Sequence, residues 1–411
     1  MNDIITIGGI RICIDRSNPL PGGQGQAFLG HLEDDPTIGV VAKKLNDRPD
    51  NLARADYLVN RHLCEMSPAF AGPFAAEELS DGHVWHVAPF VRGVELEKDQ
   101  PRSLVENLEI CLETVSLFAI LAHHGLAHGD IAFSNILIDQ DGTVSVIDFD
   151  GYVADDPTSL PSPVIGQRPM LAPELRLEQQ GQPNVESDRF ALAVFLSMLV
   201  TGRYPTDGFP DVPAEIDLLL TDGTWPERKR LPAPDELPIE ALGPEIQALF
   251  DRAFSLDPKV RPEPEEWRLV LTKALDNCWI HDCGNPFVAG PNTTHCPWCG
   301  STVEIKSNAH SLKVILPASG HRYRAELKEG ETITLGRSTI PDLPQVVSRR
   351  HLEITPFRDK LLLRHVGNHD TLIEVSDQWY RLEQHWAKID NLGTQRGRLK
   401  LADIEVHLVV E

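Results

Sequence analysis

Residues 128–135 read His128-Gly129-Asp130-Ile131-Ala132-Phe133-Ser134-Asn135, and Asp148-Phe149-Asp150 begins eighteen residues after Asp130. One acid can orient or deprotonate a hydroxyl, while an amide and a second acid can hold magnesium on a nucleotide. Phosphoryl transfer needs such a set from a protein, because its chemistry is mostly positioning and charge neutralisation. The pattern predicts that Asp130 is the base or the acid that orients the hydroxyl, and that Asn135 and Asp148 bind magnesium.

Length and charge set broad limits on the protein. With 411 residues, the chain is long enough for two or three domains. It carries 38 basic and 61 acidic residues, a formal net charge of −23, which argues against nucleic-acid binding. The N-terminus lacks the pattern of a secretory signal, and the longest apolar stretch, 190–200, is about half a membrane span. The sequence predicts a soluble cytoplasmic protein without membrane association.

Residue patterns predict a multidomain α+β chain. Residues 1–93 favour a small twisted sheet, with strands at 4–6, 10–13, 39–45 and 84–90 and one helix over 52–65. Helical periodicity follows at 104–123, 190–200, 244–254 and 265–275. A small β lobe before a larger helical lobe suits a nucleotide cleft between them. Residues 277–303 form a Cys/Gly/Pro-rich insert, and short strands at 312–316, 323–327, 332–335, 361–364 and 404–410 favour a sandwich.

The order of the motifs resembles eukaryotic-type serine/threonine protein kinases over roughly residues 10–275. The resemblance implies a bilobal kinase domain at 1–276, with lobes at 1–93 and 94–276, that uses ATP with Mg²⁺ or Mn²⁺. It identifies 171–174 as the A-P-E element. Glu174 is then the expected ion-pair partner of Arg261, and Asp188 is the acid that braces the catalytic loop. Sugar and antibiotic kinases share part of the core but lack these three elements together, so a protein substrate is favoured.

The same resemblance identifies nucleotide contacts. The glycine-rich segment 20–27 allows backbone amides to approach phosphate oxygens, and the expected contacts are Gly22, Gly23, Gly25 and Ala27. Residues 88–91 match the hinge, where the Pro89 carbonyl and the Val91 amide would bind adenine, with Ala88 as a small gatekeeper.

One lysine of the strand at 39–45 should reach the α- and β-phosphates. Lys43 is favoured because it shares a strand face with Val41 and Leu45, whereas Lys44 matches the family wording better. The helix acid that pairs with this lysine in kinases is Asp56 or Glu65.

Four positions depart from the kinase pattern. Gly129 replaces an arginine that clasps an activation-loop phosphate, and Asp150 replaces the glycine of D-F-G. Ala132 and Gln167 replace a lysine and a threonine near the transferred phosphate. These departures favour the alternative of a weak or inactive pseudokinase scaffold that binds nucleotide.

Four cysteines lie within 22 residues, a spacing that favours metal over disulfides in a reducing compartment. Cys278, Cys283, Cys296 and Cys299 resemble the two knuckles of a zinc ribbon over residues 277–303, and His281 could replace Cys278 as a ligand. Four such ligands would close a structural tetrahedral Zn²⁺ site.

Residues 335–337 and 348–351 resemble the G-R and S-R-x-H signature of forkhead-associated (FHA) domains, over about 310–411. The resemblance implies an all-β sandwich in which Arg337 and Ser348 bind phosphothreonine. Asn368 stands in a degenerate form of the family's later N-G-T turn, and His351 is interpreted as a core-packing residue.

Together these patterns predict a serine/threonine kinase whose own reader domain binds phosphothreonine in partners, substrates or itself. Thr158 is a candidate ligand for that domain. The combination resembles bacterial signalling systems in which such a kinase works beside a phosphatase.

Overall fold

The computed structural model describes residues 3–22, 25–48, 50–96, 102–139, 142–154, 166–177, 181–204, 218–230, 233, 236–290, 293–303, 310–317, 319, 322–327, 331–357, 360–375, 378–382, 387–389 and 396–410. They form two units, residues 1–300 and 301–411. Within the described ranges, none of the helices combines the length and the apolarity that crossing a membrane requires.

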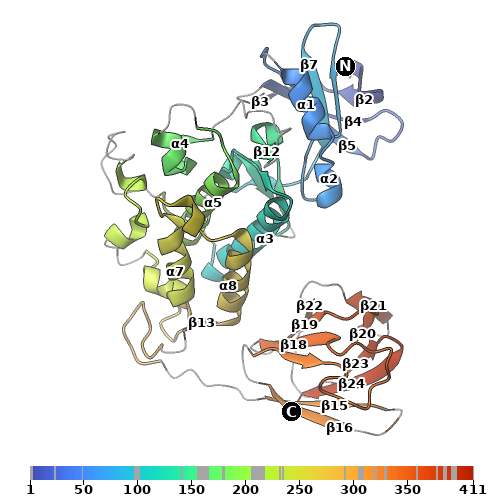
Figure 1. The fold of residues 1–411 in the computed structure, drawn as a ribbon, viewed down its shortest axis with the longest axis vertical. Helices are drawn as coiled ribbons and strands as arrows, with labels where there is room; N and C mark the ends of the chain where they lie inside the picture. Colours follow the sequence, from blue (N-terminus) through green and yellow to red (C-terminus); the bar gives the residue numbers. More distant parts are fainter. Residues whose placement is uncertain are drawn as a thin grey trace. The chain divides into compact units, whose positions relative to one another are not determined.

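A seven-stranded antiparallel sheet opens the first unit, with the order β1-β2-β4-β5-β7-β6 and with β3 paired to β4 (Figure 1). Its strands are β1 (Asp3–Ile7), β2 (Ile10–Ile14), β3 (Leu20–Gly22), β4 (Gly25–Leu32), β5 (Gly39–Leu45), β6 (Ala75–Glu78) and β7 (Val84–Pro89). One face buries an apolar cluster that includes Phe28, Ala42 and Val87. Because side chains alternate along a strand, the neighbouring positions of β5 and β7 face the other way.

The helix predicted over 52–65 is wrong in extent. The structure has α1 (Asn51–Val59) and a short α2 (Leu63–Met66). His62, between them, has a φ of 51°, in the left-handed region that interrupts a helix. Buried Leu58 and Ala55 place α1 against β6 and β7.

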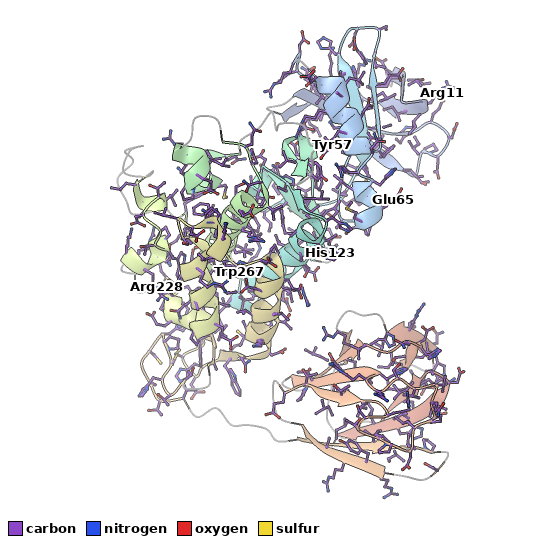
Figure 2. The ribbon with its side chains drawn as sticks, in the orientation of Figure 1. Arg11, Tyr57, Glu65, His123, Arg228 and Trp267 are labelled. Carbon is purple, nitrogen blue, oxygen red and sulfur yellow. The ribbon has the colours of Figure 1, made fainter. Side chains whose placement is uncertain are left out.

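Four longer helices build the second lobe: α3 (Leu104–His123), α5 (Val185–Thr201), α7 (Gly243–Ala253) and α8 (Pro264–Asp276). A capping box between Ser103 and Glu106 starts α3. Helix α5 is buried on nearly all sides, as its apolar sequence predicts, and α3 and α7 pack against it. Trp267 of α8, labelled in Figure 2, is 1% exposed within this core.

Short elements precede and connect these helices. They are β8 (Val94–Glu95), β9 (Leu126–Ala127), η1 (Phe133–Asn135), β10 (Ile136–Ile138), β11 (Val144–Val146), η2 (Phe149–Gly151), β12 (Val153–Ala154), η3 (Arg168–Met170), α4 (Pro173–Leu177), η4 (Pro226–Lys229), η5 (Ile239–Leu242) and η6 (Pro258–Val260). Strand β9 pairs with β12, and β10 pairs with β11. These pairings hold the loop at 128–135 beside the loop at 147–152.

The cysteine-rich insert forms a hairpin of β13 (Cys278–Ile280) and β14 (Pro286–Val288). Cys278 and Val288 belong to the apolar core of the helical lobe, so the hairpin is anchored there.

The second unit consists of two antiparallel sheets around one apolar core. One sheet has the order β16-β15-β24-β23-β20-β21 and the other β17-β18-β19-β22. The strands are β15 (His310–Ile315), β16 (Arg322–Leu327), β17 (Ile333–Leu335), β18 (Leu352–Phe357), β19 (Lys360–His365), β20 (Thr371–Val375), β21 (Gln378–Leu382), β22 (Ala387–Ile389), β23 (Arg396–Leu401) and β24 (Ile404–Val410).

Candidate functional site

Strand register separates the two candidate lysines. Lys43 lies opposite Ala27 on β4 and His86 on β7. Its side chain is 10% exposed, and its Nζ donates to Asp148 Oδ1 at 2.8 Å. Lys44 points to the opposite face, where its Nζ lies 2.8 Å from Asp81 Oδ2. Of the two lysines, Lys43 is therefore the one that contacts Asp148.

A second carboxylate holds the same lysine. Lys43 Nζ donates to Asp150 Oδ2 at 2.7 Å, and His86 Nε2 lies 3.4 Å from Asp150 Oδ1. Burial by itself lowers the pKa of Lys43, but the charges of Asp150 and Asp148 outweigh it and raise the pKa above its ordinary value. Burial opposes ionisation of Asp150 too, yet Lys43 and His86 hold its pKa below the usual range.

The expected helix acid is absent from this pair. Asp56 is exposed, and Glu65 (Figure 2), whose side chain is 79% exposed, lies 3.4 Å from His62 instead. Both candidates for the partner of Lys43 are therefore wrong. Arg54 also lies on the buried face of α1, where it is 8% exposed, and the sequence analysis does not single it out. Its spacing of four from Leu58 is the signal that places it on the buried face of the helix.

The loop at 128–135 is braced from α5. The backbone N–H groups of His128 and Gly129 donate to Asp188 at 2.6 and 3.1 Å. Burial raises the pKa of Asp188 to about 6, although these bonds and His128 act in the opposite direction. His128 Nε2 donates to the carbonyl of Ile147 at 3.0 Å, which ties this loop to the one that carries Asp148.

A steric constraint explains why residue 129 is a glycine. Its φ is +77°, and a Cβ there would lie 2.3 Å from the carbonyl oxygen of Gly151. Neither the backbone angle nor the space admits an arginine, so the two loops pack backbone to backbone.

Asp130 and Asn135 lie in one site. Asn135 Nδ2 donates to the backbone oxygen of Asp130 at 2.8 Å, which orients its amide oxygen as an acceptor. Among the described groups, Asp130 Oδ1 is buried without a hydrogen-bond partner. Burial raises the pKa of Asp130, and the charge of Asp148 raises it further. Asp148 itself has a φ of 59°, a left-handed angle that costs free energy in a non-glycine residue.

As far as the structure describes them, the predicted nucleotide contacts lie on β3, β4 and β7 and in the connector after β7. Gly22 and Gly25 end β3 and begin β4, and a Cβ on Gly25 would lie 2.0 Å from Lys44 O. Gly23 lies outside the described residues, as does Thr158. Pro89 ends β7, and Val91 follows it in the connector to the helical lobe.

Glu174 and Arg261 form a bidentate ion pair at 2.7 and 2.8 Å, as the sequence predicts.

Two departures from the kinase pattern lie near the loop at 128–135. Ala132 is buried, and Gln167 Nε2 donates to Ser134 Oγ at 3.4 Å. Ala132 and Gln167 thus supply no cation to the site.

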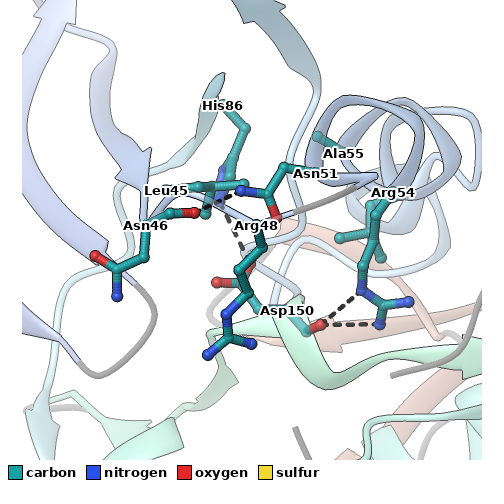
Figure 3. Close-up of a pocket in the computed structure, with 9 residues that line it drawn as sticks. Leu45, Asn46, Arg48, Asn51, Arg54, Ala55, His86 and Asp150 are labelled. Atoms are coloured by element: carbon teal, nitrogen blue, oxygen red, sulfur yellow. Dashed lines mark hydrogen bonds and ion pairs between the residues drawn. The ribbon is translucent and has the colours of Figure 1, made fainter. Parts of the chain in front are cut away.

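A pocket beside Asp150 is lined by residues of β5, β7, α1 and the loop between β5 and α1 (Figure 3). The picture shows the Arg54 guanidinium directed at the backbone of Asp150, with His86 on the other side of that residue.

A Cys/His cluster lies in the insert. One donor atom from each of His281, Cys283, Cys296 and Cys299 falls within 4.8 Å of the others. Cys283 Sγ lies 3.9 Å from Cys296 Sγ, and Cys299 Sγ lies 3.4 Å from His281 Nδ1. Tetrahedral Zn²⁺ with sulfur at about 2.3 Å requires edges of roughly 3.8 Å, so the donor set and spacing fit that ion.

Cys278 is wrong as a ligand of this cluster. It is 1% exposed in the apolar core of the helical lobe, where it pairs with Val288 in the hairpin. The turn after β13 carries His281 to the cluster in its place. Gly284 and Gly300, each directly after a cysteine of the cluster, have φ of 85° and 70°.

The candidate reader residues of the second unit lie in neighbouring loops. Ser348 Oγ accepts a hydrogen bond from the Asn368 backbone N–H at 2.8 Å. Arg337 donates from Nε to Val347 O at 2.5 Å, beside Ser348. His351 is fully buried, and its Nδ1 accepts from the Ser348 N–H at 3.1 Å, as expected for a packing residue.

Comparisons agree with this geometry. A family model of the protein kinase domain matches residues 81–279. The chain is 33% identical over 194 residues to the probable serine/threonine-protein kinase PknB of Lactococcus lactis, which covers 45% of this chain and 30% of the relative. It is 27% identical over 210 residues to the protein kinase YegI of Escherichia coli K12, 47% of this chain and 32% of the relative.

The chain spans about a third of the length of both relatives. The family match begins after β5, so Lys43 is placed by geometry and not by that match. Residues 81–279, which include the loop at 128–135 and the ion pair of Glu174 and Arg261, match the protein kinase domain, and the relatives of the chain include protein kinases of bacteria.

Proposed function

We propose that this chain is a serine/threonine protein kinase that uses ATP and Mg²⁺. One observation carries the proposal: Lys43 Nζ lies 2.8 Å from Asp148 Oδ1, although the two residues are 105 positions apart. A phosphate-binding cation and a metal-binding carboxylate in contact are what a triphosphate site needs. The oriented Asn135 amide adds a second oxygen ligand that fits magnesium, and the unpartnered Asp130 Oδ1 is available to a substrate hydroxyl.

In this proposal each residue has a defined task. Asp148 and Asn135 hold the metal, which would neutralise charge on the phosphates. Lys43 binds the α- and β-phosphates. Asp130 accepts the proton of the substrate hydroxyl, and the raised pKa of its carboxyl group makes it a better base than an exposed aspartate. Asp188 fixes the loop that carries Asp130.

The direct test is transfer of radioactive phosphate from γ-labelled ATP to the protein itself or to generic protein substrates. Labelling by wild type, with loss in Asp130→Asn at unchanged folding, supports the kinase. Absence of labelling by correctly folded wild type contradicts it.

Ala132 and Gln167 favour a second candidate, a scaffold that binds nucleotide without turnover. Neither side chain supplies the cation or hydroxyl that the resemblance leads one to expect near the transferred phosphate. Tight MgATP binding without any labelling would establish the scaffold and exclude the enzyme.

We further propose that residues 310–411 read phosphothreonine in a protein partner, a substrate or this chain itself, in the manner of an FHA domain. Ser348 and Arg337 support it, because a hydroxyl and a cation in the connection between β17 and β18 can bind phosphate oxygens. Phosphothreonine peptides should bind wild type, and both Ser348→Ala and Arg337→Ala should bind them at least tenfold more weakly. Arg398→Ala is the control, since Arg398 pairs with Glu374 and Glu405.

The cluster of His281, Cys283, Cys296 and Cys299 is proposed to hold one structural Zn²⁺. Four protein donors leave no position for a substrate, and metal would stabilise a hairpin with little core of its own.

A further inference from the structure

Asp150 occupies the position where the kinase pattern has a glycine, and it is almost fully enclosed. Its side chain is 11% exposed, and that of Lys43 is 10% exposed. A carboxylate in such a place is costly unless it is paired. The Asp150 carboxylate is paired with Lys43 and lies beside His86.

Helix α1 contacts this residue with a cation. Arg54 Nε and Nη2 donate to the backbone oxygen of Asp150 at 3.1 and 2.8 Å (Figure 3). Nη2 also donates to the backbone oxygen of Tyr152. The helix thus holds the loop by its carbonyl groups, while the loop supplies the carboxylate. In the expected arrangement the helix supplies the acid that pairs with the lysine. Here the loop supplies that acid, Asp150, and the helix supplies a cation, Arg54.

We propose that Asp150 is the positioning residue of Lys43 and that Arg54 couples it to α1. The positioning of a phosphate-binding lysine rests on the proposed kinase function. Two carboxylates contact Lys43 Nζ, but Asp148 is also the proposed magnesium ligand. When Asp148 binds the metal, Asp150 remains as the anion that fixes the position of the Lys43 side chain.

The proposal predicts opposite effects on binding and on turnover. Asp150→Asn removes an anion near the phosphates, so the affinity for MgATP should stay equal or increase. Turnover should fall about a hundredfold, because a misplaced catalytic group costs roughly that factor. Lys43→Gln removes the phosphate contact itself and should reduce both affinity and turnover.

A merely structural role for Asp150 would weaken nucleotide affinity and turnover together. The measurements are calorimetric titration with MgATP and the initial rate of labelling. An Asp150→Asn protein with turnover within threefold of wild type contradicts the proposal. So does a folded variant whose MgATP affinity falls as far as that of Lys43→Gln.

A second measurement does not depend on activity. Pulse proteolysis in urea reports the folded fraction of the first unit for Lys43→Met, Asp150→Asn and the double variant. If the two side chains form a functional pair, the midpoint shift of the double variant is smaller than the sum of the single shifts. Lys44→Met with Asp150→Asn is the matched control and should be additive, because Lys44 points to the other face.

Additive shifts for Lys43 and Asp150 contradict the pairing even if the protein is an active kinase. Absence of labelling by wild type, together with non-additive shifts, would instead remove the proposed function and leave the pair intact. Should Asp150→Asn fail to fold, Asp150→Ser provides the same comparison with a smaller side chain.

Discussion

Gly129 and Gly151 pack backbone to backbone, so that a Cβ on Gly129 would lie 2.3 Å from the Gly151 carbonyl oxygen. Gly129→Ala should therefore cost more than the strain of a left-handed angle, which alone is about 1–3 kcal/mol. Thermal unfolding of Gly142→Ala supplies the control, since Gly142 has a φ of +84° and open space around the Cβ position. Equal losses of melting temperature in the two variants would refute the steric argument.

The ion pair of Arg261 and Glu174 should matter for stability. The Arg261 side chain is fully buried, and that of Glu174 is 23% exposed. Arg261→Met leaves a partly buried carboxylate unpaired and should destabilise the first unit by about 3–5 kcal/mol. The exposed pair of Arg228 and Asp251 is the matched control, and Arg228→Met should cost at most about 1 kcal/mol in urea unfolding. Similar costs at the two sites would contradict the account.

The zinc content of the protein should depend on Cys283 but not on Cys278. Cys283→Ser removes a donor of the cluster and should lose the bound zinc, as should His281→Ala. Cys278→Ser should retain one zinc per chain, because Cys278 lies in the apolar core. Elemental analysis of purified protein makes the comparison. Loss of zinc from folded Cys278→Ser, with retention in His281→Ala, would restore the four-cysteine prediction.

As the pH is lowered, activity should begin to fall at a higher pH than it would if the catalytic aspartate had an ordinary pKa. Burial and the charge of Asp148 raise the pKa of Asp130, and a base must be deprotonated to work. The value of kcat/KM for ATP, which reports the free enzyme, should therefore decrease as the pH falls through this raised pKa. With MgATP bound, the charge of Asp148 is neutralised, so the acid limb of kcat should lie at lower pH. Circular dichroism over the same range is the control for folding, and coincident limbs would contradict this assignment.

The sequence predicts the parts of the site that depend on strand alternation and on motif order. Period two along β5 distinguishes Lys43 from Lys44, and the register with β7 agrees. The bounds predicted for α3 are those observed. Strand β6, Ala75–Glu78, was not predicted, because alanine and glutamate have poor strand propensity and only the pairing with β7 holds them extended.

The remaining errors have tertiary causes. The expected helix acids are Asp56 of α1 and Glu65 of α2, but the second carboxylate that holds Lys43 beside Asp148 comes from Asp150, 107 residues further along the chain. The ligand Cys278 was chosen from spacing, while burial in the helical lobe removes it and a turn brings His281 forward. Neither fact is visible in local sequence, because each depends on which segments meet in the folded chain.

The most direct test of the nucleotide site is a calorimetric titration of the full chain with ATP, with and without magnesium. The account predicts saturable binding that strengthens with the metal, and it predicts that this strengthening disappears in Asp148→Asn. The contact of Lys43 with Asp148 motivates both expectations. A folded wild-type protein that binds no ATP in the presence of magnesium would contradict the central claim.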